Sequence, residues 1–220
     1  MTQTVHEPSV ETLIQLLTPE GERRSHAEYD RYIQDVDAAM LRDFYRDMAL
    51  TRRFDQEATA LQRQGQLALW VPLRGQEAAQ IGSGRATRPN DYIFPTYREH
   101  GVALTRNVDF PQMLRIFRGI SNGGWDPREN NFHMYTMVLA AQMPHATGYA
   151  MGVQRDQAGW DAERLEKEGT AVVAYFGDGS STEGEVHESM VFAASFEAPV
   201  VFFCQNNQWA ISVPFHVQSK

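Results

Sequence analysis

The clearest hydrophobic pattern of this sequence lies toward its C-terminal end. Residues 171–176 form a continuous apolar run, which is typical of a parallel strand buried on both faces. A second apolar run covers residues 200–204. Between them, Thr182 and Glu185 have the spacing of a capping box, which predicts a helix that runs through about Phe196. Strand, helix and strand together predict a right-handed crossover, so we expect an α/β fold with a mainly parallel sheet flanked by helices.

Upstream, apolar residues recur mostly at helical spacing. The longest such pattern begins at Val36 and ends near Gly65, and this helix should pack one face on a core or on a partner subunit. The other expected elements are helices near 75–82, after Arg98, over 110–117 and over 142–153, a strand over 91–94, and a linker or short helix over 156–169.

The N-terminal segment differs in character from the rest of the chain. It is polar and is interrupted by Pro8, Pro19 and Gly21, which break any regular pattern. We therefore predict two parts: an arm over residues 1–34 and one α/β domain over residues 35–220.

Composition and charge narrow the possible classes of protein. With 42% hydrophobic and 22% charged residues, the chain has the composition of a soluble globular protein, and no stretch reaches the ~20 apolar residues of a membrane span. A net charge of −8 argues against binding to nucleic acid or to an anionic membrane surface. The single cysteine, Cys204, excludes an internal disulfide and is expected to be a buried strand residue. Because the N-terminal segment is also rich in glutamate, unlike a secretory or mitochondrial leader, we expect a cytoplasmic protein.

Polar side chains follow both C-terminal apolar runs. Asp178 comes after the first, Asn206 and Asn207 come after the second, and 26 residues separate Gly179 from Asn206. Because a crossover places the carboxyl ends of both strands at one edge of the sheet, these side chains should meet in one crevice. Gly177 and Gly179 would allow a sharp turn and a close approach to a ligand.

This turn combines a feature that attracts an anion with one that repels it. Backbone N–H groups at the start of the following helix favour phosphate, whereas the Asp178 carboxylate opposes it. A divalent cation that bridges carboxylate and phosphate oxygens resolves the conflict, and magnesium prefers such oxygen ligands. Asp178 and Asn207 are therefore candidate magnesium ligands. The alternative is a plain Gly-Asp-Gly turn in which Asp178 caps a helix.

Longer stretches around these residues carry a family resemblance. The Gly-Asp-Gly turn, the 26-residue gap and the paired asparagines resemble the signature of thiamine-diphosphate-dependent enzymes. Residues 74–78, 95–101, 177–188 and 202–212 resemble the alpha subunit of the decarboxylating component of pyruvate and branched-chain 2-oxo acid dehydrogenases. The similarity runs from about Met40 to the last residue, and it implies a thiamine-diphosphate-binding fold with thiamine diphosphate and magnesium as cofactors.

The resemblance also implies roles for individual residues. Asp178, the side-chain oxygen of Asn207 and the backbone carbonyl of Trp209 would hold magnesium. The residues expected to contact the cofactor are Tyr97, Arg98, Leu139, Gly177, Gly179 and Ser180. Arg98 could instead form a surface ion pair with Glu99 or another acid, and Leu139 could be an ordinary core residue. Two positions depart from some relatives: Gln205 replaces an arginine that reaches the diphosphate, and Met137 replaces a small polar or glycine residue.

The resemblance implies an oxidative decarboxylase of pyruvate or branched-chain 2-oxo acids that transfers the acyl group to lipoyl groups. No catalytic residue is expected in this chain, because the glutamate that activates the cofactor belongs to a beta subunit. The implied partners are that beta subunit, in a heterotetramer, and the lipoyl-bearing acyltransferase. An acetoin dehydrogenase alpha subunit and a non-catalytic assembly subunit are the alternatives. Because the family continues beyond Lys220, we expect a chain that is C-terminally truncated or only partly recorded. If these are all its residues, it should form a cofactor half-site without turnover.

Overall fold

The computed structural model describes residues 14–218, and the expected break at Pro8 lies outside them. The chain divides into two compact units, Met1–Asp43 and Phe44–Lys220. The described part of the first unit contains a short 3-10 helix, Asp30–Tyr32, and a bridge that pairs Leu17 with Arg23. Helix α1 (Ala38–Arg63) begins in the first unit and ends in the second. The division between an arm and a domain after residue 34 stays a prediction.

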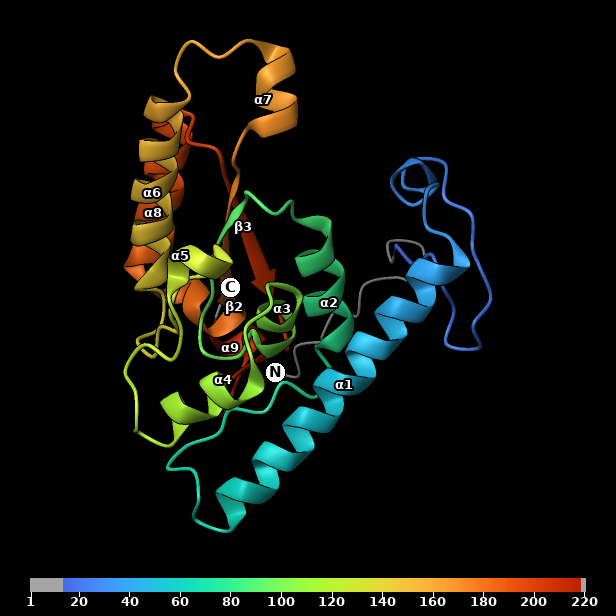
Figure 1. The fold of residues 1–220 in the computed structure, drawn as a ribbon, viewed down its shortest axis with the longest axis vertical. Helices are drawn as coiled ribbons and strands as arrows, with labels where there is room; N and C mark the ends of the chain where they lie inside the picture. Colours follow the sequence, from blue (N-terminus) through green and yellow to red (C-terminus); the bar gives the residue numbers. More distant parts are fainter. Residues whose placement is uncertain (1–13, 219–220) are drawn as a thin grey trace, which may run out of the picture. The chain divides into compact units, whose positions relative to one another are not determined.

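The second unit contains the sheet and its helices (Figure 1). After α1 its elements are α2 (Glu77–Ala86), β1 (Tyr92–Phe94), α3 (His100–Thr105), α4 (Phe110–Phe117), α5 (Pro127–Asn130), α6 (Gln142–Asp156), α7 (Ala162–Glu168), β2 (Val172–Gly177), the 3-10 helix η3 (Asp178–Thr182), α8 (Gly184–Phe196), β3 (Val200–Gln205), β4 (Trp209–Ala210), β5 (Val213–Pro214) and α9 (Phe215–Gln218).

The three longer strands form a parallel sheet in the order β1-β2-β3, which confirms the predicted α/β class. Val172 lies beside Val200 at one end of the β2–β3 pair, and Gly177 lies beside Gln205 at the other. The strands β4 and β5 form a separate antiparallel pair, which the sequence pattern does not predict. Since all three parallel strands run the same way, the segments that follow them leave from the same edge of the sheet.

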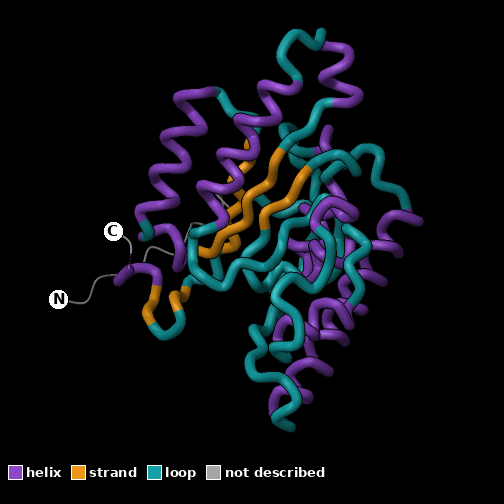
Figure 2. The backbone as a smooth tube through the Cα atoms, turned by 60° about the vertical axis from the view of Figure 1, so that its left-hand side comes forward, coloured by secondary structure: helices purple, strands orange, loops and turns teal. Residues whose placement is uncertain are grey.

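Helices cover both faces of this sheet, as the unbroken apolar run in β2 predicts (Figure 2). Val173 and Tyr175 pack on one face, in a core shared with α1, α3 and α4. Val172, Ala174 and Phe176 point to the opposite face, in a core shared with α6 and α8. Because successive side chains of a strand point to opposite faces, this one apolar segment contributes to two hydrophobic cores.

Two local predictions are wrong. Thr182 and Glu185 form no capping box, because residues 178–182 turn into η3 and α8 begins only at Gly184. The Thr182 hydroxyl donates to the carbonyl of Gly179 at 3.4 Å instead of capping α8. Cys204 is exposed rather than buried, because β3 is an edge strand of the sheet within the described residues.

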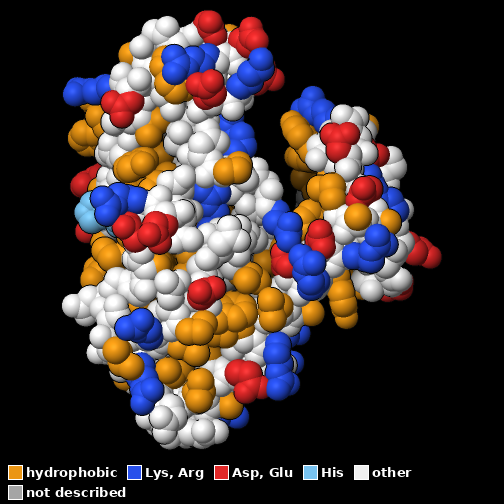
Figure 3. Space-filling view, viewed as in Figure 1, with side chains coloured by type: hydrophobic (Ala, Val, Ile, Leu, Met, Phe, Trp, Pro, Cys, Tyr) orange, Lys and Arg blue, Asp and Glu red, His pale blue; other side chains and the backbone are white. Residues whose placement is uncertain are grey.

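The long helix α1 uses only part of its surface for the core. Phe54 and Ala58 are buried, whereas Tyr45 is 73% exposed and Leu50 is 44% exposed. Figure 3 shows hydrophobic side chains gathered on one face of the molecule, over α4 and the neighbouring part of α1. Within residues 14–218, no helix combines the length and the apolar character that crossing a bilayer requires.

Two glycines of α2 offer a matched test of the packing between α2 and α3. A Cβ atom at Gly84 would collide with the Thr105 side chain, whereas a Cβ atom at Gly82 would meet nothing within 4 Å. We expect Gly84→Ala to lower the free energy of unfolding by about 1–3 kcal/mol, because overpacking displaces neighbouring groups. Gly82→Ala should raise it by roughly 0.5–1 kcal/mol, because alanine favours a helix. Urea unfolding measures both, and equal effects would contradict the close packing of the two helices.

Candidate functional site

Hydrogen bonds join the segments that follow all three parallel strands. The Gln205 side chain, at the end of β3, donates to the Glu99 carboxylate after β1 at 2.5 Å. The backbone N–H of Asn207, after β3, donates to Oδ1 of Asp178, after β2, at 3.2 Å. The common carboxyl edge of the sheet is therefore a connected polar region, as the crossover topology predicts.

Asp178 is the central side chain of this region. It is only 2% exposed, and its Oδ2 atom has no hydrogen-bond partner within the described residues. Its backbone carbonyl accepts a hydrogen bond from the Gln218 side chain at 3.0 Å. A buried carboxylate oxygen without a donor is unfavourable unless a proton or a cation compensates its charge.

The loop that contains Asn207 is fixed by its own side chains. The backbone N–H of Trp209 donates to Oδ1 of Asn207 at 2.9 Å, and that of Gln208 donates to Oδ1 of Asn206 at 2.8 Å. Gln208 has a φ of 70°, which a tight turn requires here. An amide oxygen has two lone pairs, so Asn207 can accept this bond and still ligate a cation.

The turn after β2 is held closely against β4. A Cβ atom at Gly179 would lie 3.2 Å from the Cβ of Ala210, so a larger residue would push η3 and β4 apart. The Gln218 side chain of α9 also donates to the carbonyl of Gly179, at 2.9 Å. Gln218 is a site residue that sequence reasoning missed, because a glutamine on a short terminal helix carries no motif.

Tyr97 and Arg98 lie in the segment that follows β1. Arg98 Nε donates to the carbonyl of Pro72 at 3.0 Å, and its guanidinium lies 5.6 Å from the Tyr97 ring centroid. The Gln80 side chain donates to the Arg98 carbonyl at 3.0 Å and accepts from the Gly101 N–H at 2.9 Å. The backbone around Arg98 is thus held from two sides, while both side chains remain partly exposed.

Leu139 is 45% exposed, which is unusual for a core leucine. Three residues later, the Gln142 side chain donates to the carbonyl of Tyr175 at 2.7 Å. This bond places the start of α6 beside the C-terminal half of β2. Leu139 therefore lies toward the same edge of the sheet as Asp178, with much of its side chain uncovered.

Glu99 is a second buried acid that sequence reasoning missed. Its Oε2 accepts hydrogen bonds from the backbone and the hydroxyl of Thr96, both at 2.6 Å, while its Oε1 accepts the bond from Gln205. Burial raises the pKa of this carboxyl above its usual range, although the Thr96 donors and the Arg98 charge act in the opposite direction. The expected alternative role of Glu99, as a surface partner of Arg98, is wrong because the carboxylate is buried.

The neighbouring His100 belongs to the core rather than to the site. It stacks on Trp70 with ring centroids 4.4 Å apart, and burial lowers its pKa to about 3. Its Nε2 lies 3.3 Å from the carbonyl of Val71, which can only accept, so Nε2 carries the proton and Nδ1 accepts from the Tyr135 hydroxyl. His100 therefore has a packing role.

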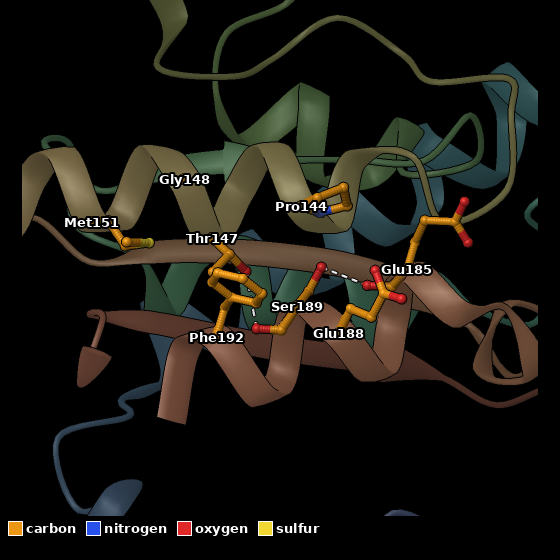
Figure 4. A pocket seen from close by; sticks show the side chains of 8 residues that line it. All are labelled: Pro144, Thr147, Gly148, Met151, Glu185, Glu188, Ser189 and Phe192. Carbon is orange, nitrogen blue, oxygen red and sulfur yellow. Dashed lines mark hydrogen bonds between the residues drawn. The ribbon is translucent and has the colours of Figure 1, made fainter. Parts of the chain in front are cut away.

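A cavity of about 350 Å³ lies between α6 and α8 (Figure 4). Its two hydroxyl groups are already bonded to backbone carbonyls, Thr147 to Ser189 at 3.4 Å and Ser189 to Glu185 at 2.5 Å. The remaining lining includes the apolar side chains of Met151 and Phe192 and two exposed glutamates, Glu185 and Glu188. The cavity therefore has no free hydroxyl donor. The strand edge is the stronger candidate site, because it holds a buried carboxylate oxygen that has no partner within the described residues.

The strand edge can hold a hard cation through oxygen atoms. Within the described residues, no group of three or more histidine, cysteine, aspartate or glutamate side chains is arranged to hold a metal. A cation at Asp178 would therefore need amide and backbone oxygens to complete its coordination. Asn207 and Trp209, in the loop that touches Asp178, carry such oxygens, and these suit magnesium better than zinc.

Comparison with known proteins identifies the family to which this chain belongs. The sequence matches the family described as "Dehydrogenase E1 component" over residues 45–220. It is 41% identical over 206 residues to "3-methyl-2-oxobutanoate dehydrogenase subunit alpha" of Mycobacterium tuberculosis, which covers 94% of this chain and 53% of that protein. It is 35% identical over 187 residues to "2-oxoisovalerate dehydrogenase subunit alpha" of Bacillus subtilis, with coverages of 80% and 54%.

The name of a third relative gives a different substrate. The chain is 32% identical over 206 residues to "Pyruvate dehydrogenase E1 component subunit alpha" of Bacillus cereus, with coverages of 94% and 52%. The chain spans about half the length of these curated relatives. Since the family match extends over most of the chain and includes every candidate site residue, this chain belongs to the dehydrogenase E1 component family.

Proposed function

We propose that this chain binds thiamine diphosphate through magnesium, as the alpha-type subunit of a 2-oxo acid dehydrogenase. The observation that carries the proposal is the contact between Asp178 and the Asn207 loop, at 3.2 Å, beside a buried Asp178 oxygen that has no partner within the described residues. A divalent cation at this oxygen would compensate the buried charge. It would also allow an anionic diphosphate to bind beside an aspartate in a chain whose net charge is −8.

The proposed ligands have distinct roles. Asp178 supplies the only formal negative charge among them, while the Asn207 amide and the Trp209 carbonyl supply neutral oxygens. Magnesium commonly takes one or two protein carboxylates and completes its octahedron with phosphate oxygens and water. The backbone of Gly177, Gly179 and Ser180 would face the diphosphate and the atoms that link it to the thiazolium ring.

Arg98 is proposed to hold the diphosphate from the other side. Its Nε is already bonded to Pro72, and among residues 14–218 its terminal nitrogens have no recorded hydrogen bond. A guanidinium with two free terminal nitrogens can donate to two phosphate oxygens at once. Tyr97 would lie beside it, and the uncovered Leu139 side chain would pack under the cofactor.

When bound, thiamine diphosphate supplies the nucleophilic carbon and the electron sink for loss of carbon dioxide from a 2-oxo acid. This chain anchors and orients the cofactor and is assigned no catalytic acid or base, since the activating glutamate is proposed to come from a beta subunit. The exposed apolar residues Tyr45 and Leu50 of α1 are available for such a partner. The product acyl group would pass to a lipoyl-bearing acyltransferase. Because the relatives' names include both pyruvate and branched-chain substrates, the proposal covers this class of 2-oxo acids.

Calorimetric titration of the purified chain with thiamine diphosphate, with magnesium and again after chelation of the metal, tests the proposal. We expect the affinity to fall at least about tenfold when magnesium is removed, because the diphosphate would then face an uncompensated Asp178. Thiamine without its diphosphate serves as the control and should bind weakly under both conditions. Equal affinity for thiamine diphosphate with and without magnesium would contradict the proposal.

A further inference from the structure

The bond between Glu99 and Gln205 connects two halves of the proposed site. The two residues are 106 positions apart in the sequence and almost completely buried, at 1% and 8% exposure. Glu99 follows the Tyr97–Arg98 pair directly, and Gln205 lies two residues before Asn207. One hydrogen bond thus spans from the segment that carries Arg98 to the loop that contacts Asp178.

This bond belongs to a small hydrogen-bond network in which all donors to Glu99 are neutral groups. Glu99 receives two hydrogen bonds from Thr96 and one from Gln205, so both carboxylate oxygens are satisfied. No arginine or lysine ion pair is recorded for Glu99 within the described residues. Burying an acid whose hydrogen-bond donors are all neutral is unfavourable, and the loss of one donor leaves its charge less compensated.

Only one of the two polar atoms of the Gln205 amide has a hydrogen-bond partner within the described residues. Its nitrogen donates to Glu99, while its oxygen is buried without a hydrogen-bond partner within the described residues. The amide can, however, rotate by half a turn and accept a hydrogen bond from residue 99 if that residue becomes a donor.

We propose that Glu99 and Gln205 form a buried latch that sets the position of Arg98 relative to Asp178, which makes Glu99 a positioning residue for the diphosphate. The inference rests on the proposed function. The latch would affect binding because the diphosphate has two contacts on different segments. One is a cation at Asp178, and the other is the guanidinium of Arg98. If the latch is broken, each segment keeps its own local bonds, but the separation between the two contacts is no longer fixed.

The test compares Glu99→Ala with Glu99→Gln in the full chain. With saturating magnesium, we expect Glu99→Ala to weaken thiamine diphosphate binding by about 10- to 100-fold, the range for losing a hydrogen bond to a charged group and the geometry that it fixes. Glu99→Gln should stay within about threefold of the parent, because the rotated Gln205 amide restores the bond. Glu188→Ala, on the exposed surface of α8, is the matched control and should change nothing.

Further variants keep the test decisive if Glu99→Ala fails to fold. Gln205→Ala should weaken cofactor binding in the same way, and the exchanged pair Glu99→Gln with Gln205→Glu should restore it. Melting temperatures of the cofactor-free variants separate lost binding from lost folding. Parent-like affinity in Gln205→Ala would overturn the latch while leaving the proposed function standing. If the unaltered chain shows no magnesium-dependent binding, the proposed function fails first, and the latch with it.

Discussion

Asp178→Ala is expected to abolish magnesium-dependent binding of thiamine diphosphate while the chain remains folded. Asp178 supplies the only formal charge among the proposed ligands, so its removal should weaken cofactor affinity at least about 100-fold. The fold should persist because the lost side chain accepts one hydrogen bond, from Asn207, and its other oxygen has no partner within the described residues. Removing a buried charge that lacks compensation can even stabilise the cofactor-free chain. Calorimetry and thermal unfolding measure the two effects separately.

Asp178→Asn is the matched control for this prediction. The amide can still accept the hydrogen bond from Asn207, but it has no charge with which to hold a divalent cation. We therefore expect Asp178→Asn to retain the melting temperature of the parent and to lose most of the magnesium dependence. Parent-like cofactor affinity in either variant would show that Asp178 is not a ligand.

The second large effect is expected on the free energy of unfolding, when Arg106 is replaced. This side chain is only 7% exposed and joins segments around the start of β1. Arg106→Ala would remove four hydrogen bonds to backbone carbonyls, of which the bond to Asp91 is buried and the others are partly buried, so we expect a loss of about 3–5 kcal/mol in the free energy of unfolding. Its nitrogens donate to the carbonyls of Arg88 at 2.8 Å, Pro89 at 2.9 Å, Asp91 at 2.7 Å and Asn130 at 3.1 Å.

Arg128 provides the control for Arg106. Its side chain is 89% exposed and pairs with Asp126 on the surface, so Arg128→Ala should leave the free energy of unfolding almost unchanged. Arg106→Lys should recover only part of the loss. The single nitrogen of an ammonium group cannot donate to all the carbonyls that lie around a planar guanidinium. Equal unfolding energies for the two alanine variants in urea would disprove the assignment of Arg106 as a structural donor.

Much of the fold could be predicted because its signals are local. The apolar run at 171–176 became the central strand β2, and helices were observed at Phe110–Phe117 and Gln142–Asp156, where periodicity placed them. The capping-box prediction was wrong because the same residues can begin an α-helix or form a 3-10 turn. The contact between η3 and β4 selects the turn, and Ala210, which packs on Gly179, lies too far along the chain for a local pattern to reveal it.

The candidate site, too, could be predicted only in part from the sequence. Crossover topology alone brings Asp178 near the paired asparagines, and the structure joins them at 3.2 Å. The Glu99–Gln205 bond could not be predicted, because nothing in either residue type indicates a partner 106 positions away. The roles of Tyr97, Arg98 and Leu139 came from resemblance rather than from spacing, and they stay proposals.

The most direct test is anomalous X-ray diffraction from crystals grown with manganese, as a substitute for magnesium, and thiamine diphosphate. The account predicts one anomalous peak bonded to a carboxylate oxygen of Asp178, the side-chain oxygen of Asn207 and the carbonyl of Trp209, at the ~2.0–2.2 Å expected for oxygen ligands. A peak elsewhere in the chain, or a bound cofactor whose diphosphate lies away from Asp178 with no metal beside it, would contradict it.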